Sequence, residues 1–284
     1  MSPEALGLVL TAGLLHASWN LILKRTDERL LVASWSLVAG AVLFSPALIR
    51  AWPPPPDVWP FVSASASVFV IYYAALSWAY RQGDFSLVYP VARGTAPAMI
   101  ALWAILFLGE RPSALGLAGI GLILLGLVVL GGAPLWASRG DWKRHSRGLL
   151  PAFFVALLIS IYSVIDGAGV RRWEPVPYIV LTFALSGGVL VPALVVREGR
   201  SAVSALRSNL VPIVAIAALT LAAYGLVLRA FQIAPISYAG AAREISIVFG
   251  ALAGWLLLGE RFGGPRTLGA VLVFFGIGVL AIAP

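Results

Sequence analysis

The chain has 284 residues, of which 60% are hydrophobic and 11% charged, and its formal net charge is +8. Soluble domains carry roughly 25% charged residues, so this composition excludes an ordinary soluble protein and indicates one that crosses a membrane many times. The basic residues of such a protein belong to its loops, so we expect no nucleic-acid partner. The chain has no cysteine, which excludes disulfides and thiol chemistry.

Apolar runs of membrane length follow one another along the whole chain. A helix needs ~20 apolar residues to cross a bilayer, whereas a transmembrane strand needs ~10 residues with alternating character. The continuous runs therefore predict an all-α membrane protein with ten transmembrane helices. The first run follows Glu4 where a signal peptide would be basic, so we expect it to be a retained span. The expected spans are 5–23, 30–49, 60–80, 86–107, 114–132, 149–169, 176–196, 210–230, 237–258 and 266–283.

The sequence Leu-Gly-Glu-Arg occurs twice, at 108–111 and 258–261, each time at the end of an apolar run and before a glycine-rich one. The two copies lie 150 residues apart. An arginine precedes the leucine of each copy by fifteen residues, at Arg93 and Arg243. An arginine inside a membrane-length run, twice at the same register, predicts a function for both. The Glu-Arg pairs themselves are expected to fix turns and to take no part in chemistry.

The repeat predicts two halves of five helices each, over residues 1–138 and 149–284, joined by a basic connector at 139–148. Because five is odd, the second half should lie upside down in the membrane relative to the first, as in many secondary transporters. The connectors after the odd-numbered spans hold thirteen Lys and Arg residues, against four on the opposite side. Cytoplasmic loops carry this excess, so we expect both termini on the non-cytoplasmic side of a bacterial-type inner (plasma) membrane.

Polar side chains inside the expected spans are candidates for a site, because a charge at mid-bilayer costs ~2.5–3.5 kcal/mol even on a lenient scale. In the first span His16, Trp19 and Asn20 share one helix face by their spacing. Arg93 lies between two prolines in the run 89–97, and proline frees backbone groups and bends a helix. We expect Arg93 to bind a carboxylate, with snorkelling to the surface as the alternative. Further cavity candidates are Tyr73, Tyr80 and Tyr89.

The second half contributes different candidates. Arg243 and Glu244 are adjacent, and adjacent residues of a helix point about 100° apart, so they should not pair with each other comfortably. The pairs Arg93 with Glu244 and Arg243 with Asp166 are both open as structural ion pairs. His16 is interpreted either as a neutral interhelical hydrogen-bonding group or as a proton-sensitive or substrate-contacting group. His16, Glu244 and Asp166 are the candidates for ion coupling. The remaining cavity candidates are Tyr162, Tyr224 and Tyr238.

Ten spans in two halves, each with a fourth span ending in Leu-Gly-Glu-Arg and a glycine-rich fifth, resemble the EamA-type members of the drug/metabolite transporter superfamily. The resemblance covers nearly the whole chain and extends to bacterial metabolite exporters, including the YddG-type aromatic amino-acid exporters. It implies two inverted repeats around a central cavity lined by spans 1, 3, 4, 6, 8 and 9, with alternating access by rocking of the halves. Small four-span members use a glutamate in their first span for proton coupling, whereas this first span has only His16.

We therefore expect a secondary transporter that exports amino acids and related small metabolites. Its expected partners are the small-molecule substrate and the lipid bilayer, with no cofactor and no metal, and the monomer is expected to suffice. A multidrug or nucleotide-sugar transporter is the alternative. An enzyme is disfavoured because the chain has no His-Glu-x-x-His, no Gly-x-Ser-x-Gly and no paired intramembrane aspartates. Proline-broken helices and buried arginines at matching positions disfavour a channel or scaffold.

Overall fold

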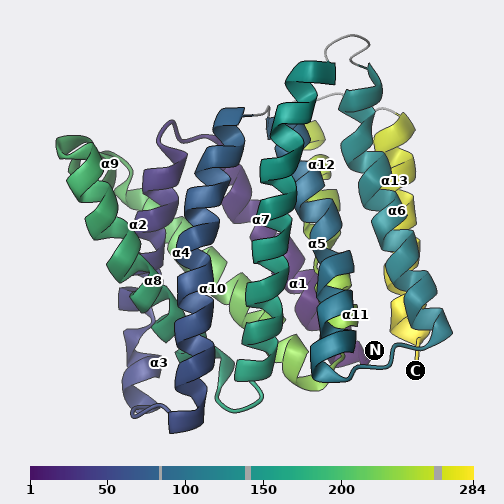
Figure 1. Ribbon diagram of the computed structural model, residues 1–284, viewed down its shortest axis with the longest axis horizontal. Coiled ribbons are helices and arrows are strands. Elements are labelled where there is room, and N and C mark those ends of the chain that lie inside the picture. The colour runs from purple at the N-terminus through teal and green to yellow at the C-terminus, as the bar shows by residue number, and fades with distance from the viewer. Residues whose placement is uncertain (83–84, 138–141, 259–263) are drawn as a thin grey trace.

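The computed structural model describes residues 1–82, 85–137, 142–258 and 264–284; in addition, the side chains of residues 80, 85–90, 131–137, 142–147, 254 and 257–258 lie outside the described set. Every described element is a helix (Figure 1), which confirms the all-α prediction. The long helices are α1 (Pro3–Lys24), α2 (Arg29–Leu43), α4 (Trp59–Gln82), α5 (Phe85–Leu108), α6 (Ala114–Ala137), α7 (Trp142–Gly169), α8 (Pro175–Glu198), α10 (Leu210–Ile233), α12 (Ile245–Leu258) and α13 (Gly264–Ile282). The short ones are α3 (Ser45–Arg50), η1 (Pro56–Val58), α9 (Arg200–Ser208) and α11 (Ile236–Ala242).

Within the described residues, eight helical segments are long and apolar enough to cross a membrane. Arg29–Leu43 and Ala114–Leu130 are shorter apolar helices at two further expected spans. The expected span 30–49 is divided, because α2 ends at Leu43 and α3 begins at Ser45. The count of ten transmembrane helices therefore stays a prediction. In the basic connector predicted at 139–148, helix α7 already begins at Trp142.

The two halves pack on each other in reciprocal pairs of helices. Helix α1 of the first half packs against α10 and α12, and α7, its counterpart in the second half, packs against α4 and α5. In the same way α2 contacts α10 while α8 contacts α4. The helix that follows each Leu-Gly-Glu-Arg, α6 or α13, packs against its own counterpart at one edge of the bundle (Figure 1). This reciprocity is what two structural repeats related by a two-fold axis produce.

The seam between α6 and α13 shows how the repeats are related. A Cβ added at Gly119 would lie 2.9 Å from the side chain of Leu280 and 3.0 Å from the carbonyl of Gly276. One at Gly126 would lie 2.6 Å from the carbonyl of Gly269. Higher numbers on one helix thus face lower numbers on the other, so α6 and α13 run antiparallel. Gly269 and Gly276 stand 150 residues after Gly119 and Gly126, so each glycine faces the counterpart of the other. Antiparallel counterparts are the relation that inverted repeats predict.

The end of the bundle that carries both termini is held shut by polar contacts between the halves (Figure 1). Glu110, which follows α5, accepts hydrogen bonds from the backbone N–H of Ile236 at 2.6 Å and of Ser237 at 3.1 Å, and from the Ser237 hydroxyl at 2.6 Å. The hydroxyl of Tyr238 accepts a hydrogen bond from the backbone N–H of Ser113 at 3.0 Å. Glu110 was predicted to fix a local turn, and the structure corrects this, because its carboxylate caps α11 of the other half. Its counterpart Glu260 lies outside the described residues.

The glycine seam yields a first prediction. Gly126→Ala should lower the melting temperature of the purified protein in detergent, because the new methyl group collides with the backbone of α13, and overpacking costs ~1–3 kcal/mol. Gly276→Ala should have the same effect, since its Cβ would lie 2.8 Å from the carbonyl of Gly119. Gly121 lies on α6 like Gly126, and a Cβ added there meets no atom within 4 Å, so Gly121→Ala is the matched control. Equal melting temperatures for Gly126→Ala and Gly121→Ala would contradict the close seam.

Candidate functional site

A cavity of about 770 Å³ runs into the bundle from the end opposite the termini. Its mouth carries the basic side chains of Lys24, Arg29 and Arg266. The implied cavity helices α1, α4, α5, α7, α10 and α12 all contribute to its wall, and α2, α6, α8 and α13 add further side chains. Of the side chains predicted from sequence, those on the wall are His16, Trp19, Asn20, Tyr73, Arg93, Tyr162 and Tyr224.

The other candidates have different positions. The side chains of Tyr80 and Tyr89 lie outside the described residues. Tyr238 is 1% exposed and does not line the cavity, because its hydroxyl is bonded at the closed end of the bundle. Arg243 lines a recess of about 40 Å³, which it shares with His16, Arg93, Tyr162 and Tyr224.

The transmembrane helix expected over 237–258 is broken at Arg243 and Glu244. Helix α11 ends at Ala242, α12 begins at Ile245, and the two residues between them form a turn. Short-range backbone bonds, such as Ser246 N–H to the carbonyl of Arg243 at 3.2 Å, close this turn. Irregular backbone at membrane depth is tolerated where protein or a cavity surrounds it, and interrupted helices often form transporter substrate sites. By contrast α5, with its two prolines, runs unbroken from Phe85 to Leu108.

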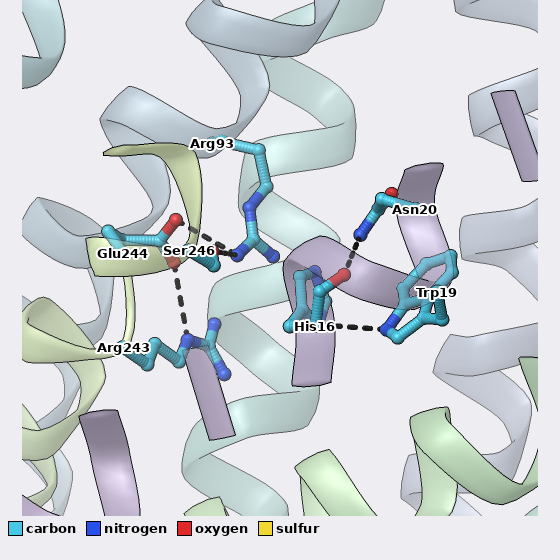
Figure 2. A network of polar contacts seen from close by, with 7 residues as sticks. All are labelled: His16, Trp19, Asn20, Arg93, Arg243, Glu244 and Ser246. Atoms are coloured by element: carbon cyan, nitrogen blue, oxygen red, sulfur yellow. Dashed lines mark hydrogen bonds and ion pairs between the residues drawn. The ribbon is translucent and has the colours of Figure 1, made fainter. Parts of the chain in front are cut away.

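Glu244 binds two arginines, one from each half (Figure 2). Its Oε2 lies 3.0 Å from Nη2 of Arg93, and its Oε1 lies 3.3 Å from Nε of Arg243. The side chain of Glu244 is fully buried, and those of Arg93 and Arg243 are only 11% and 6% exposed. Arg93 also donates a hydrogen bond to the Ser246 hydroxyl at 3.3 Å. Two guanidinium groups and one carboxylate leave a net charge of +1 in this cluster.

The cluster decides between the pairings that the sequence left open. Arg93 pairs with Glu244, so it turns inward and does not snorkel to the surface. The expectation that Arg243 and Glu244 would not pair is wrong, because it assumed a regular helix. The turn between α11 and α12 brings the two side chains together. Nη2 of Arg243 is buried and has no hydrogen-bond partner in the part of the chain that the structure describes.

Facing this cluster, the predicted polar face of α1 adopts the expected arrangement (Figure 2). The indole nitrogen of Trp19 donates a hydrogen bond to Nδ1 of His16 at 3.2 Å, and the rings meet edge to face at 4.8 Å between centroids. An indole N–H can only donate, so Nδ1 of His16 acts as an acceptor here. The Asn20 amide donates to the carbonyl of His16 at 2.7 Å. The three side chains therefore organise one another on a wall of the cavity.

Aromatic rings from three helices form the rest of the deep wall. Tyr162 of α7 lies 4.4 Å from Phe69 of α4 and 6.1 Å from Tyr224 of α10, between ring centroids. Tyr72 contacts both Phe69 and Tyr162. Phe69 and Ser246 were not among the residues predicted from sequence, because neither is unusual within an apolar span. One signal was available for Phe69, which precedes Tyr73 by four residues and so shares its helix face.

Asp166 lies behind this aromatic wall. It is fully buried, and its oxygens accept hydrogen bonds from the hydroxyls of Tyr178 at 2.8 Å and Tyr224 at 2.6 Å. It therefore joins α7, α8 and α10 without lining the cavity itself. Among the described residues, no three His, Asp or Glu side chains come together as metal ligands.

The chain matches the EamA-like transporter family twice, over residues 4–132 and again over 146–282. A solved crystal structure is similar over 98% of this chain and 96% of its own, with a TM-score of 0.81 and 20% sequence identity. At that identity the similarity shows a shared fold. Among curated proteins, none matches the chain at a significant level.

The buried cluster yields a second prediction. Glu244→Gln should destabilise the protein by ~3–5 kcal/mol, because two buried arginines lose their shared counter-charge. The measurement is chemical or thermal unfolding of the purified protein in detergent. Glu4→Gln removes a carboxylate that is 64% exposed and 3.9 Å from Arg229, and it should leave the unfolding curve unchanged. Similar curves for both variants would show that Glu244 does not hold the cluster together.

Proposed function

Because the chain belongs to the EamA-like transporter family, a family of drug/metabolite-type transporters, we propose that it exports amino acids and related small metabolites across the inner membrane. Transport proceeds by alternating access, with the two repeats rocking about the central cavity. The likeness to YddG-type aromatic amino-acid exporters belongs to the same proposal. The protein needs no cofactor for this function, and one chain encloses the whole cavity.

The surplus positive charge at the deep end of the cavity carries the proposal. Two buried guanidinium groups share one carboxylate in the cluster of Arg93, Glu244 and Arg243, so a second anionic group is favoured beside them. The recess of about 40 Å³ beside Arg243 is large enough for water or for a small charged group. A carboxylate there would accept hydrogen bonds from guanidinium nitrogens, which suit it in a bidentate geometry. This supports a substrate with a carboxylate.

The aromatic wall supports a substrate with an apolar or aromatic part. Phe69, Tyr72 and Tyr162 surround the space above the cluster, and edge-to-face contacts with a further ring add ~0.5–1.5 kcal/mol each beyond area burial. A cavity of about 770 Å³ falls within the ~300–1,000 Å³ that small-molecule sites occupy. An aromatic amino acid fits this combination of a charged end and an aromatic wall.

The direction of the cavity supports the cytoplasm-facing state of such an exporter. Its mouth lies where α1 ends and α13 begins, close to Lys24 and Arg266, and the opposite end is closed by Glu110 and Tyr238. Basic residues mark the cytoplasmic side of membrane proteins. We therefore place the mouth in the cytoplasm and both termini outside it. A substrate would enter from the cytoplasm and meet the charge cluster before the closed end opens.

The test is flux into proteoliposomes that contain the purified protein. Labelled phenylalanine should exchange across the membrane faster than in protein-free vesicles, whereas phenylalaninamide, which lacks the carboxylate, should not. Arg93→Lys keeps the positive charge beside Glu244 but loses the planar fork of donors. It should reduce phenylalanine flux roughly ten- to hundredfold, the equivalent of one lost charged hydrogen bond of ~1.5–3 kcal/mol.

Threonine, lysine and a cationic dye complete the substrate panel. Equal flux of phenylalanine and its amide would remove the role proposed for the cluster. Flux of the dye alone would favour a multidrug exporter over an amino-acid exporter. Arg229→Lys changes an arginine that is 51% exposed and far from the cavity wall, so it serves as the matched control and should transport normally.

A further inference from the structure

Asp166 and Glu244 are the two fully buried acids among the described residues, and of the two only Glu244 has a cationic partner there. Glu244 lies between two arginines. No arginine, lysine or histidine of the described residues comes within ion-pair distance of Asp166, which instead accepts hydrogen bonds from two phenols. An acid inside a membrane is expensive and usually marks an ion or proton pathway. Burial without a cation disfavours the charged form of a carboxyl group, which makes such a group a candidate for binding a proton.

The groups that face Asp166 come from every helix packed around it. Tyr178 of α8 and Tyr224 of α10 are bonded to it, and Ser65 of α4 lies beside it. Arg243, at the end of α11, acts on it electrostatically without direct contact. Tyr162 lies one turn earlier on α7 and acts on it through space. Arg93 of α5 and Glu244 act on Tyr162, on the cavity side of this network.

Hydroxyl partners suit both protonation states of the carboxyl group. A phenol has one proton to donate and lone pairs that accept. When Asp166 is ionised, both phenols donate to it, as in this structure. When it is protonated, its own O–H can donate to one phenol oxygen after a rotation of that hydroxyl. The proton of the rotated hydroxyl then needs a new acceptor, which water in the cavity can supply to Tyr224, whereas Tyr178 is fully buried.

Tyr224 connects this buried group to the cavity. Its hydroxyl lies 2.6 Å from Oδ2 of Asp166, and its ring is part of both the cavity wall and the recess beside Arg243. Tyr178 is fully buried and has no place on the cavity wall. Tyr224 therefore connects Asp166 to the cavity, whereas Tyr178 connects it only to the protein interior. The two tyrosines differ in position while making the same hydrogen bond.

We propose that Asp166 is a proton-binding site that exchanges its proton with the cavity through the hydroxyl of Tyr224. In uptake, a hydronium ion in the cavity gives a proton to the Tyr224 oxygen, while the phenolic proton of Tyr224 passes to Oδ2 of Asp166. Release runs through the same two transfers in reverse. No other bond is made or broken, and nothing is oxidised or reduced.

The protonation state of Asp166 also changes the net charge that a substrate meets at the cluster. This part of the inference rests on the proposed function. With Asp166 ionised, its negative charge offsets the surplus of the Arg93, Glu244 and Arg243 cluster. With Asp166 protonated, the surplus of +1 remains for a carboxylate in the recess. Proton binding and carboxylate binding are therefore linked, and transport should vary with pH through this one residue.

Infrared difference spectroscopy of the full-length protein in lipid tests the proton site without any substrate. Between alkaline and acidic buffer, the wild type should show the carbonyl band of a buried carboxylic acid, and Asp166→Asn should lack it. Asp57→Asn, which removes an aspartate whose side chain is 64% exposed, should keep that band. If the wild type shows no band that depends on Asp166 while it stays folded, the proposal is wrong.

Variants of the two tyrosines test the route of the proton. They retain Asp166, so they remain informative if Asp166→Asn fails to fold. After a rapid drop in pH, Tyr224→Phe should slow the rise of the band roughly ten- to hundredfold, because the bridging proton carrier is lost. Tyr178→Phe removes an equal hydrogen bond and should slow it far less. Equal effects of the two variants would show that Asp166 is only a structural tie among α7, α8 and α10.

Flux in proteoliposomes then tests the link to transport. Phenylalanine exchange by the wild type should vary with pH, and exchange by Asp166→Asn should lose that dependence. Asp57→Asn should keep the wild-type profile. The same pH profile for Asp166→Asn and the wild type would overturn the link. Absence of flux for every substrate would instead count against the proposed function, and the infrared band would still decide whether Asp166 binds a proton.

Discussion

The charge cluster at the centre of this molecule depends on the carboxylate of Glu244. It neutralises one of two buried guanidinium groups and holds Arg93 of the first half beside Arg243 of the second. Without it, two positive charges would face each other at the deep end of an apolar cavity, where charges interact far more strongly than in water. The site is thus built on one shared acid, and its spare charge is a direct consequence of that sharing.

The two repeats are symmetric at the packed seam of α6 and α13, and they differ at the charge cluster. The glycine seam of α6 and α13 obeys the 150-residue register on both sides, because close approach requires the same absence of a side chain from each helix. At the cluster the register places Arg93 opposite Arg243, but it places Gly94 where the second half has Glu244. One half supplies the acid for both arginines, so the pocket has a single orientation for a substrate within a two-fold scaffold.

The repeat and most of the cavity wall could be predicted from sequence because they follow from composition, period and register. Membrane-length runs predicted helices, and the register predicted that Arg93 and Arg243 would have related positions. The break in the second repeat could not be predicted, since no proline or glycine lies at Arg243 and Glu244, and the ion pair that accompanies it joins residues far apart in the sequence. Prolines suggested a broken helix in α5, where the surrounding packing keeps the helix continuous. Tyr238 was predicted to line the cavity because it lies on an expected cavity span, and its bond to Ser113, which is distant in sequence, could not be anticipated.

The broken helix also connects the closed end of the bundle to the charge cluster. Helix α11 is only seven residues long; Glu110 binds its first N–H groups, and it ends at Ala242, directly before Arg243. Opening the closed end must either withdraw Glu110 from α11 or move α11 as a unit with it. In the second case Arg243 moves relative to Arg93, and the recess between them changes shape. A continuous helix such as α5 would spread that displacement along its length, whereas a displacement of the short α11 would reach Arg243 directly. The short helix therefore connects the closed end of the bundle to the charge cluster.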